Sequence, residues 1–168
     1  PVPSCLPAAG AFGARAPLID RAVDTIERTR RLVRAGSVVV IDYATPITAM
    51  LAGRQWRDWL RTYRGNARGG HYLVAPGTQD ITVEIPIDQL PEPDSVRTQA
   101  QFLQRWAIDE LVEEGRRIWT EQAAQPGLHA MKMRSRISEA EALLDVDGLG
   151  SFLVAEWRSD TDGDRYCP

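Results

Sequence analysis

The chain has 168 residues, a formal net charge of −3 and 43% hydrophobic residues. This composition is typical of a folded globular domain and argues against a disordered or collagen-like chain. Because basic residues are not in excess, the charge balance argues against nucleic acid or an anionic membrane as the partner. The longest aliphatic run, residues 38–41, is too short to cross a bilayer.

The cysteines and histidines exclude several kinds of site. Cys5 and Cys167 lie near opposite ends, and we expect two free thiols in a reducing, cytoplasmic compartment, because the first residues do not resemble a signal peptide. His71 and His129 are far apart and form no zinc-binding spacing with the cysteines, so we expect no metal. Neither a P-loop nor the nucleophile elbow of a serine hydrolase is present.

The first third of the chain has a regular pattern. Residues 17–33 space their apolar side chains at about 3.6 residues, which predicts a helix with Pro17 in its first turn and Gly36 at its end. Residues 37–43 form a continuous β-branched run, which predicts a strand buried on both faces. A helix, a short turn and a buried strand are half of a parallel α/β layer.

The next segments predict strands with one wet face. Residues 51–64 are ambiguous, because their aromatic spacing fits a helix throughout or a strand over the second half. Residues 72–74 and 80–87 predict two strands with a Pro-Gly turn at 76–77. Apolar and polar residues alternate in the second of these, so we expect a half-buried antiparallel strand.

The last part of the chain predicts helices and a final strand. A helical segment is expected at about 95–125, capped by Asp94 or Ser95. A short helix opened by a serine follows at 138–144, and a strand follows at 151–157.

Three segments together resemble a known family. Residues 38–43 read VVVIDY, residues 60–64 read LRTYR and residues 76–82 read PGTQDIT. Their order and spacing resemble the MidA family of S-adenosylmethionine-dependent methyltransferases, in which a strand ends in I-D-Y-G, a T-L-R-x-Y-R segment follows, and P-G-x-x-D-[IL]-T opens another strand. Residues 101–111 are similar to a downstream helix of that family, and the resemblance covers roughly residues 17–158.

The resemblance implies an α/β fold, namely the C-terminal part of a Rossmann-like methyltransferase sheet with an inserted antiparallel β-hairpin and helices. Residues 1–16 would be a loop and residues 17–158 the methyltransferase-like domain. Within that domain the hairpin insertion would occupy about 55–90 and the helical segment about 95–125. Residues 159–168 would be a polar tail.

The cofactor site of such an enzyme is not evident in the sequence. A Rossmann methyltransferase holds S-adenosylmethionine at a glycine-rich turn after its first strand. Residues 9–13, AGAFG, lack a preceding buried strand, and the first residue is Pro1 rather than Met. We therefore expect the cofactor to be bound mainly by a part that this chain does not contain, either a missing N-terminal half or another subunit. Ala44 replaces a family glycine and Asn66 a frequent histidine, so no acid–base imidazole is expected at position 66.

The resemblance also implies candidate site residues. Mitochondrial members of the family methylate an arginine of a respiratory complex I subunit, so a protein substrate is implied. A guanidinium acceptor needs carboxylates that orient it and receive a proton. Because open α/β sheets bind ligands at the carboxyl ends of strands, Asp42 and Tyr43 are candidate catalytic residues, and Asp80 is a third. Alternatively, Asp42 caps the following loop and Asp80 stabilises its turn. The expected substrate-binding residues are Arg61, Tyr63 and Arg64.

A series of arginines at intervals of three and four is interleaved with aromatic residues. The series comprises Arg54, Arg57, Arg61, Arg64 and Arg68. Such a pattern is compatible with a surface for single-stranded nucleic acid, but the acidic balance of the chain favours a solvated face with aromatic residues behind it. A third possibility is that Arg61 and Arg64 pair with Asp42 or Asp80.

The sequence thus supports three hypotheses. The first is that the chain is the C-terminal part of a cytoplasmic, bacterial methyltransferase that acts on a protein arginine. The second is a non-catalytic protein-interaction module on a truncated methyltransferase fold. The third, an arginine-rich nucleic-acid binder, is disfavoured by the net charge of −3.

Overall fold

The computed structural model describes residues 3–159 and divides them into two compact units. The first unit holds the residues up to Val38, Asp42–Asp94 and those from Glu156 on, and the second holds Val39–Ile41 and Ser95–Ala155. Among the described residues, no helix is long and apolar enough to cross a membrane. The expected tail at 159–168 lies outside the described residues, apart from its first position.

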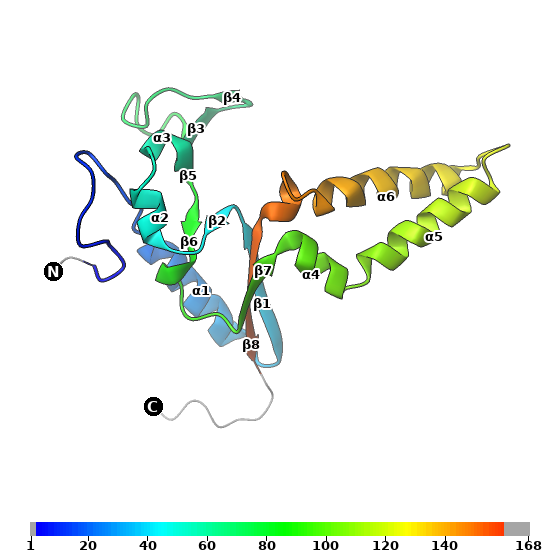
Figure 1. The fold of residues 1–168 in the computed structure, drawn as a ribbon, viewed down its shortest axis with the longest axis horizontal. Coiled ribbons are helices and arrows are strands. Elements are labelled where there is room, and N and C mark those ends of the chain that lie inside the picture. The colour runs from blue at the N-terminus through cyan, green and yellow to red at the C-terminus, as the bar shows by residue number, and fades with distance from the viewer. Residues whose placement is uncertain (1–2, 160–168) are drawn as a thin grey trace. The chain divides into compact units, whose positions relative to one another are not determined.

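Helices and strands alternate irregularly along the chain (Figure 1). The elements are α1 (Asp20–Leu32), β1 (Gly36–Asp42), β2 (Ala44–Thr45), α2 (Thr48–Ala52), α3 (Trp56–Trp59), β3 (Leu60–Arg64), β4 (Ala67–Arg68), β5 (Asp80–Val83), β6 (Ile85–Pro86), η1 (Ile87–Gln89), β7 (Ser95–Thr98), α4 (Gln99–Arg105), α5 (Ile108–Glu121), α6 (Leu128–Leu144), η2 (Leu149–Ser151) and β8 (Leu153–Ser159). The strands form a sheet of order β1-β8-β7, a parallel pair β2-β6 and an antiparallel sheet of order β4-β3-β5.

Strand β1 lies where the β-branched run predicts it, but its burial differs from the prediction. Val38 is buried, whereas Val39 and Ile41 are 40% and 44% exposed. Successive side chains of a strand point to opposite faces, so only the face that includes Val38 is covered by described residues. The prediction of burial on both faces is therefore wrong for this structure.

Helix α1 is shorter than the sequence predicts. It begins at Asp20, so Pro17 precedes the first turn, and the Pro17 carbonyl accepts a hydrogen bond from the Gln89 side chain. The helix ends at Leu32, and Gly36 instead opens β1 with a positive φ of 119°. Gly36 therefore turns the chain into the strand, because the left-handed region favours glycine.

The ambiguous segment 51–64 contains both predicted structures. Two short helices, α2 and α3, precede strand β3, which pairs antiparallel with β4 and with β5. The predicted strand at 72–74 is wrong: these residues form turns, and Leu73 and Val74 are 65% and 57% exposed. The amide of Gln79 donates to the carbonyls of His71 and Val74, so the loop satisfies its backbone without a strand partner.

The second unit contains helices α4, α5 and α6. Thr98 caps α4 through a reciprocal capping box with Gln101, so neither Asp94 nor Ser95 is the cap, and Ser95 belongs to β7. Helix α6 begins at Leu128, ten residues before the predicted start at Ser138, and its apolar residues do not follow a single stripe. This absence of a stripe explains why periodicity did not reveal its first half.

The core of the second unit lies between α4, α5 and α6. Ile108, Val112 and Ala140 are buried together, and the partly buried residues packed against them are Leu103, Ile137 and Leu144. Gly115 of α5 is buried, and a Cβ at this position would lie 3.2 Å from Cγ1 of Ile137. Helices α5 and α6 therefore approach closely at Gly115, where any side chain would press against Ile137.

Replacing Gly115 by valine should destabilise the chain. The new side chain must displace Ile137 of α6, and overpacking of this kind costs about 1–3 kcal/mol. Urea unfolding of Gly115→Val and of the control Glu114→Val separates this cost from the helix propensity of valine, because Glu114 is exposed on the same helix. Equal unfolding free energies for the two variants would contradict the close approach.

Candidate functional site

The end of β1 presents the first candidate catalytic residue. Asp42 is the last residue of β1, and the backbone N–H of Tyr43 donates to its Oδ1 at 2.8 Å. Burial raises the pKa of the Asp42 carboxyl above its ordinary value, and the hydrogen bond from Tyr43 opposes this shift only in part. A carboxyl group in this state holds a proton more readily than an exposed aspartate.

The register of the antiparallel sheet brings several predicted residues together. Tyr63 of β3 is opposite Asp80 of β5 and Arg68 of β4, and Arg61 is opposite Thr82. Residues two apart on a strand share a face, so Arg61, Tyr63, Arg68 and Asp80 project from the same side of the sheet. The guanidinium of Arg61 lies 5.4 Å from the ring centroid of Tyr43, which connects this face to the residue after Asp42.

Arg64, in contrast, points to the other face of β3. Its Nη2 donates to the hydroxyl of Thr78 at 2.8 Å, in the loop before β5. Among the residues that the structure describes, neither Arg61 nor Arg64 forms an ion pair with Asp42 or Asp80. Direct pairing of these predicted site residues is therefore not found. The arrangement joins Tyr43 to Arg61 and Tyr63 to Asp80.

Glu84, which the sequence did not single out, accepts hydrogen bonds from two residues of the first unit. Nη1 and Nη2 of Arg54 donate to its two oxygens at 2.7 and 2.9 Å, and the Thr45 hydroxyl donates at 2.8 Å. Burial by itself would raise the pKa of Glu84, but the hydrogen bonds from Arg54 and Thr45, with the charges of Arg54 and Arg61, lower it overall. The one sequence signal for Glu84 was its polar place in an alternating strand.

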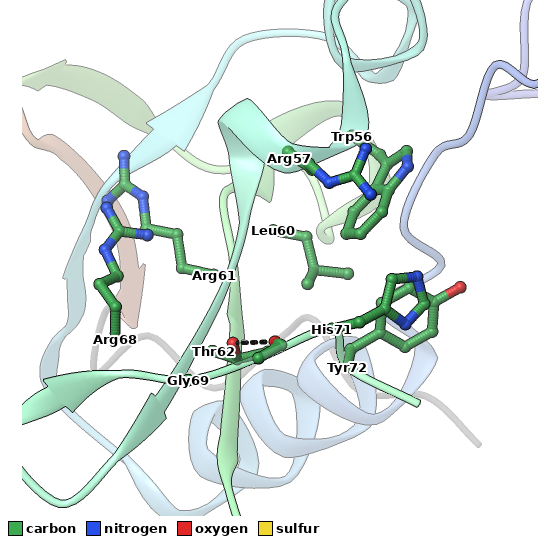
Figure 2. A pocket seen from close by; sticks show the side chains of 10 residues that line it. Trp56, Arg57, Leu60, Arg61, Thr62, Arg68, Gly69, His71 and Tyr72 are labelled. Atoms are coloured by element: carbon green, nitrogen blue, oxygen red, sulfur yellow. Dashed lines mark hydrogen bonds between the residues drawn. The ribbon is translucent and has the colours of Figure 1, made fainter. Parts of the chain in front are cut away.

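A pocket with a cavity volume of about 350 Å³ lies beside β3. Figure 2 shows the residues that line it, with Thr62 donating its hydroxyl to the Gly70 carbonyl at 2.7 Å. The lining residues are Trp56, Arg57, Leu60, Arg61, Thr62, Arg68, Gly69, Gly70, His71 and Tyr72. A Cβ on Gly69 would lie 2.6 Å from Oε1 of Gln79 and 2.8 Å from the Thr62 hydroxyl, so a larger residue would require these side chains to shift.

Aromatic rings form one wall of this pocket. Trp56 contacts His71 and Tyr72 edge-on at centroid distances of 5.2 and 5.3 Å, and His71 stacks on Tyr72 at 4.5 Å. Arg15 donates to the Tyr72 hydroxyl at 2.6 Å and lies 5.0 Å from the Trp56 ring centroid. Because the Arg15 side chain comes from the N-terminal loop, the sequence spacing alone could not bring it to this wall.

Part of the arginine series has the environment of a solvated face with rings beside it. Arg57 lies 4.5 Å from the centroid of Trp56, and Arg68 lies 5.5 Å from that of Tyr63. Trp59, in contrast, is only 3% exposed and belongs to the core of the first unit. Trp56 and Tyr63 are partly buried and lie beside exposed arginines, whereas Arg54 pairs with Glu84, so the series does not form one uniform solvated face.

Within residues 3–159, neither a metal-binding cluster nor the strand that a cofactor turn at residues 9–13 would need is found. Residues 3–159 contain no group of three or more His, Cys, Asp or Glu side chains that could hold a metal. Residues 9–13 lie in a loop, with no strand before them among the described residues. The pocket lining contains no carboxylate for the ribose hydroxyls of S-adenosylmethionine. Cys5 is a free thiol, and Cys167 lies outside the described residues.

Comparison with known proteins identifies a shared fold. No family model matches the chain, and no curated protein matches it. An uncharacterized protein of the COG1565 superfamily from Burkholderia thailandensis is 20% identical, with a TM-score of 0.65 over 90% of this chain. A second member from this organism, described as a "likely methyl transferase" bound to S-adenosyl-homocysteine, is 21% identical with a TM-score of 0.60 over 87% of this chain.

The shared fold confirms the predicted α/β class with helices and an antiparallel hairpin. The matched region covers 42% of the first solved chain and 38% of the second, so this chain spans well under half of either. At 20% and 21% identity, the likeness shows the fold alone and leaves the MidA resemblance as a prediction.

Two threonines on neighbouring strands give a matched test of the pocket wall. Thr62→Val removes the hydrogen bond to the Gly70 carbonyl and should lower the free energy of unfolding by about 1 kcal/mol. Thr82 has a buried hydroxyl with no hydrogen-bond partner among residues 3–159, so Thr82→Val should be neutral or stabilising. Denaturant unfolding of both variants measures the difference, and an equal loss in both would contradict the pairing.

The ion pair of Glu84 should make stability depend on pH. The pKa of Glu84 is lower in the folded chain than in the unfolded chain, so its stabilisation is present above the unfolded value and is lost as pH falls through the folded value. A double-mutant cycle with Arg54→Gln and Glu84→Gln should therefore give a favourable coupling at pH 7 that disappears in acid. A coupling that is unchanged by acid would show that another group carries the effect.

Proposed function

We propose that this chain is part of an S-adenosylmethionine-dependent methyltransferase that acts on a protein arginine side chain. The observation that carries the proposal is the fold shared with the Burkholderia thailandensis protein that holds S-adenosyl-homocysteine, the product of methyl donation. The sequence resemblance at residues 38–43, 60–64 and 76–82 supports the same activity. The arginine substrate comes from the family resemblance alone.

The proposal assigns the cofactor mainly to residues outside this chain. When bound, S-adenosylmethionine supplies the methyl group. Since the loop at residues 9–13 follows no strand among the described residues, and the described lining of the pocket beside β3 includes no carboxylate for the ribose, we assign the cofactor to another part of the enzyme or another subunit. In this proposal the chain contributes to the acceptor side of the active site.

We propose that Asp42 binds the arginine side chain that accepts the methyl group. A carboxylate pairs with a guanidinium in a bidentate way and fixes its orientation. Burial raises the Asp42 pKa, and this makes its carboxylate a better proton acceptor for a guanidinium nitrogen that becomes methylated. Tyr43 and Arg61, which stack on each other beside Asp42, would form the wall of this subsite.

A non-catalytic interaction module is the second candidate. The observation that favours it is the poor fit of the described residues to the cofactor. The two candidates differ in one measurable property, because a non-catalytic module transfers no methyl group when the whole reading frame is expressed.

Cofactor binding and methyl transfer test the proposal. Calorimetry with S-adenosylmethionine should show micromolar binding to the product of the complete reading frame and none at that level to residues 1–168. The product should also move radiolabelled methyl groups to arginine in unmethylated protein extracts. Micromolar binding by residues 1–168 alone would overturn the assignment of the cofactor to another part. Absence of transfer by the complete product would favour the interaction module, and label on another residue type would overturn the arginine acceptor.

Asp42→Asn should lower activity and raise stability. Loss of a general base typically costs 10²–10⁴-fold in rate, so we expect methyl transfer to fall by about 100-fold or more. The charged form of Asp42 is disfavoured in the folded chain, so the neutral amide should raise the melting temperature at pH 7, and the gain should shrink as pH falls and Asp42 takes up its proton. The control Asp24→Asn, exposed on α1, should change neither property. A destabilised but active Asp42→Asn would point to a capping role.

A further inference from the structure

The pocket beside β3 concentrates positive charge. Its lining, as far as the described residues form it, includes Arg57, Arg61 and Arg68 and no acidic residue. Within the part of the chain that the structure describes, none of these three arginines forms an ion pair. Like charges that share a small cavity repel one another, so an arrangement of this kind is favoured when an anion neutralises it.

The nearby carboxylates Glu84 and Asp80 form no ion pair with these three arginines among the described residues. Glu84 feels the charge of Arg61, but both of its oxygens accept hydrogen bonds from Arg54. Asp80 shares the sheet face with Arg61 and Arg68 yet pairs with neither among the described residues. The guanidinium groups of the pocket are therefore free to bind a carboxylate from another molecule.

Each of the three guanidiniums rests near an aromatic ring. The distances to the ring centroids are 4.5 Å for Arg57 and Trp56, 5.4 Å for Arg61 and Tyr43, and 5.5 Å for Arg68 and Tyr63. A ring supports the guanidinium through its face and leaves N–H groups at the edge available for a carboxylate. The rings restrict the arginine rotamers before a ligand arrives, which lowers the entropic cost of binding.

The same rings argue against nucleic acid as the occupant. Binding of single strands depends on ring faces on which bases can stack. Trp56 has guanidiniums of Arg15 and Arg57 near it, and Tyr72 stacks on His71. A base would have to displace these groups, whereas a carboxylate can use the free edges of the arginines.

We propose that this pocket binds the carboxylate side chains of an acidic segment of the protein substrate. The proposal rests on the proposed function, since it takes the substrate to be a protein. The volume of about 350 Å³ is at the lower end of ordinary ligand pockets and suits side chains of an extended segment. Because three arginines surround the space, the segment binds best with at least two carboxylates close in sequence.

The test is peptide binding by the complete 168-residue chain, followed by fluorescence anisotropy. The probe is a labelled peptide in which glutamates flank one arginine, and its control is the same peptide with glutamines. We expect salt-sensitive binding of the glutamate peptide only. Arg57→Gln and Arg68→Gln, both at exposed positions, should each weaken it about tenfold, which corresponds to the loss of one charge-assisted contact. Arg28→Gln, exposed on α1, is the matched control and should bind as the wild-type chain does.

Four outcomes would overturn the proposal. They are equal affinity for the two peptides, unchanged affinity in both pocket variants that remain folded by circular dichroism, tighter binding of an oligothymidine of the same length, and full competition by free glutamate at equal carboxylate concentration. The last two would identify nucleic acid or a small acid as the ligand. The binding assay needs no cofactor, so it tests this proposal separately from methyl transfer. Peptide binding can be absent while methyl transfer is present, and peptide binding can be present while methyl transfer is absent.

Discussion

The unit that carries the candidate site depends on the neutralisation of one largely buried carboxylate. The side chain of Glu84 is 12% exposed, and an unpaired carboxylate at such a position would be costly. Arg54, from the loop between α2 and α3, and Thr45 of β2 satisfy its oxygens. The backbone on either side is held as well, since the Glu84 N–H donates to the Trp59 carbonyl and the N–H of the next residue donates to Tyr43. The hairpin is therefore held next to the end of β1 by one set of polar contacts.

The pairing of Arg54 with Glu84 leaves the other arginines of the series without this carboxylate as a direct partner. Arg54 pairs with Glu84, and Arg64 donates a hydrogen bond to Thr78 on the opposite face of β3. Arg57, Arg61 and Arg68 remain, and they line the pocket with rings beside them. The evenly spaced arginines therefore have two roles. Arg54 and Arg64 make contacts within the fold, because one pairs with Glu84 and the other lies on the opposite face of β3. The other three line the cavity.

The sequence predicted elements well where the pattern is local and poorly where partners are distant. The β-branched run predicted β1, but its burial depends on which elements cover each face, and Val39 and Ile41 are exposed in the described structure. The capping box of Thr98 and Gln101 is a local signal that was present in the sequence and was missed.

For the candidate site, too, the sequence predicted local features but not contacts between distant segments. Arg61 and Tyr63 were predicted from motifs, and the structure places both on one face of β3. Their contacts could not be predicted, because Tyr43, Arg15 and Glu84 come from other segments, and only the tertiary fold fixes those distances. The segment 72–74 was predicted as a strand from its apolar residues, yet the Gln79 amide holds it as a loop.

Charge places a further constraint on the proposed substrate. An arginine acceptor is itself cationic, and the pocket would repel it if the segment that carries it were neutral or basic. Arg61 lies over Tyr43, so the positive wall of the pocket begins at the residue next to Asp42. In the proposed binding mode, a substrate with carboxylates beside its arginine would resolve the conflict, because the carboxylates would enter the arginine pocket and the guanidinium would reach the carboxyl of Asp42. Under the proposed function, the pocket and Asp42 together would select arginines with acidic neighbours, and repulsion would exclude an arginine within a basic segment.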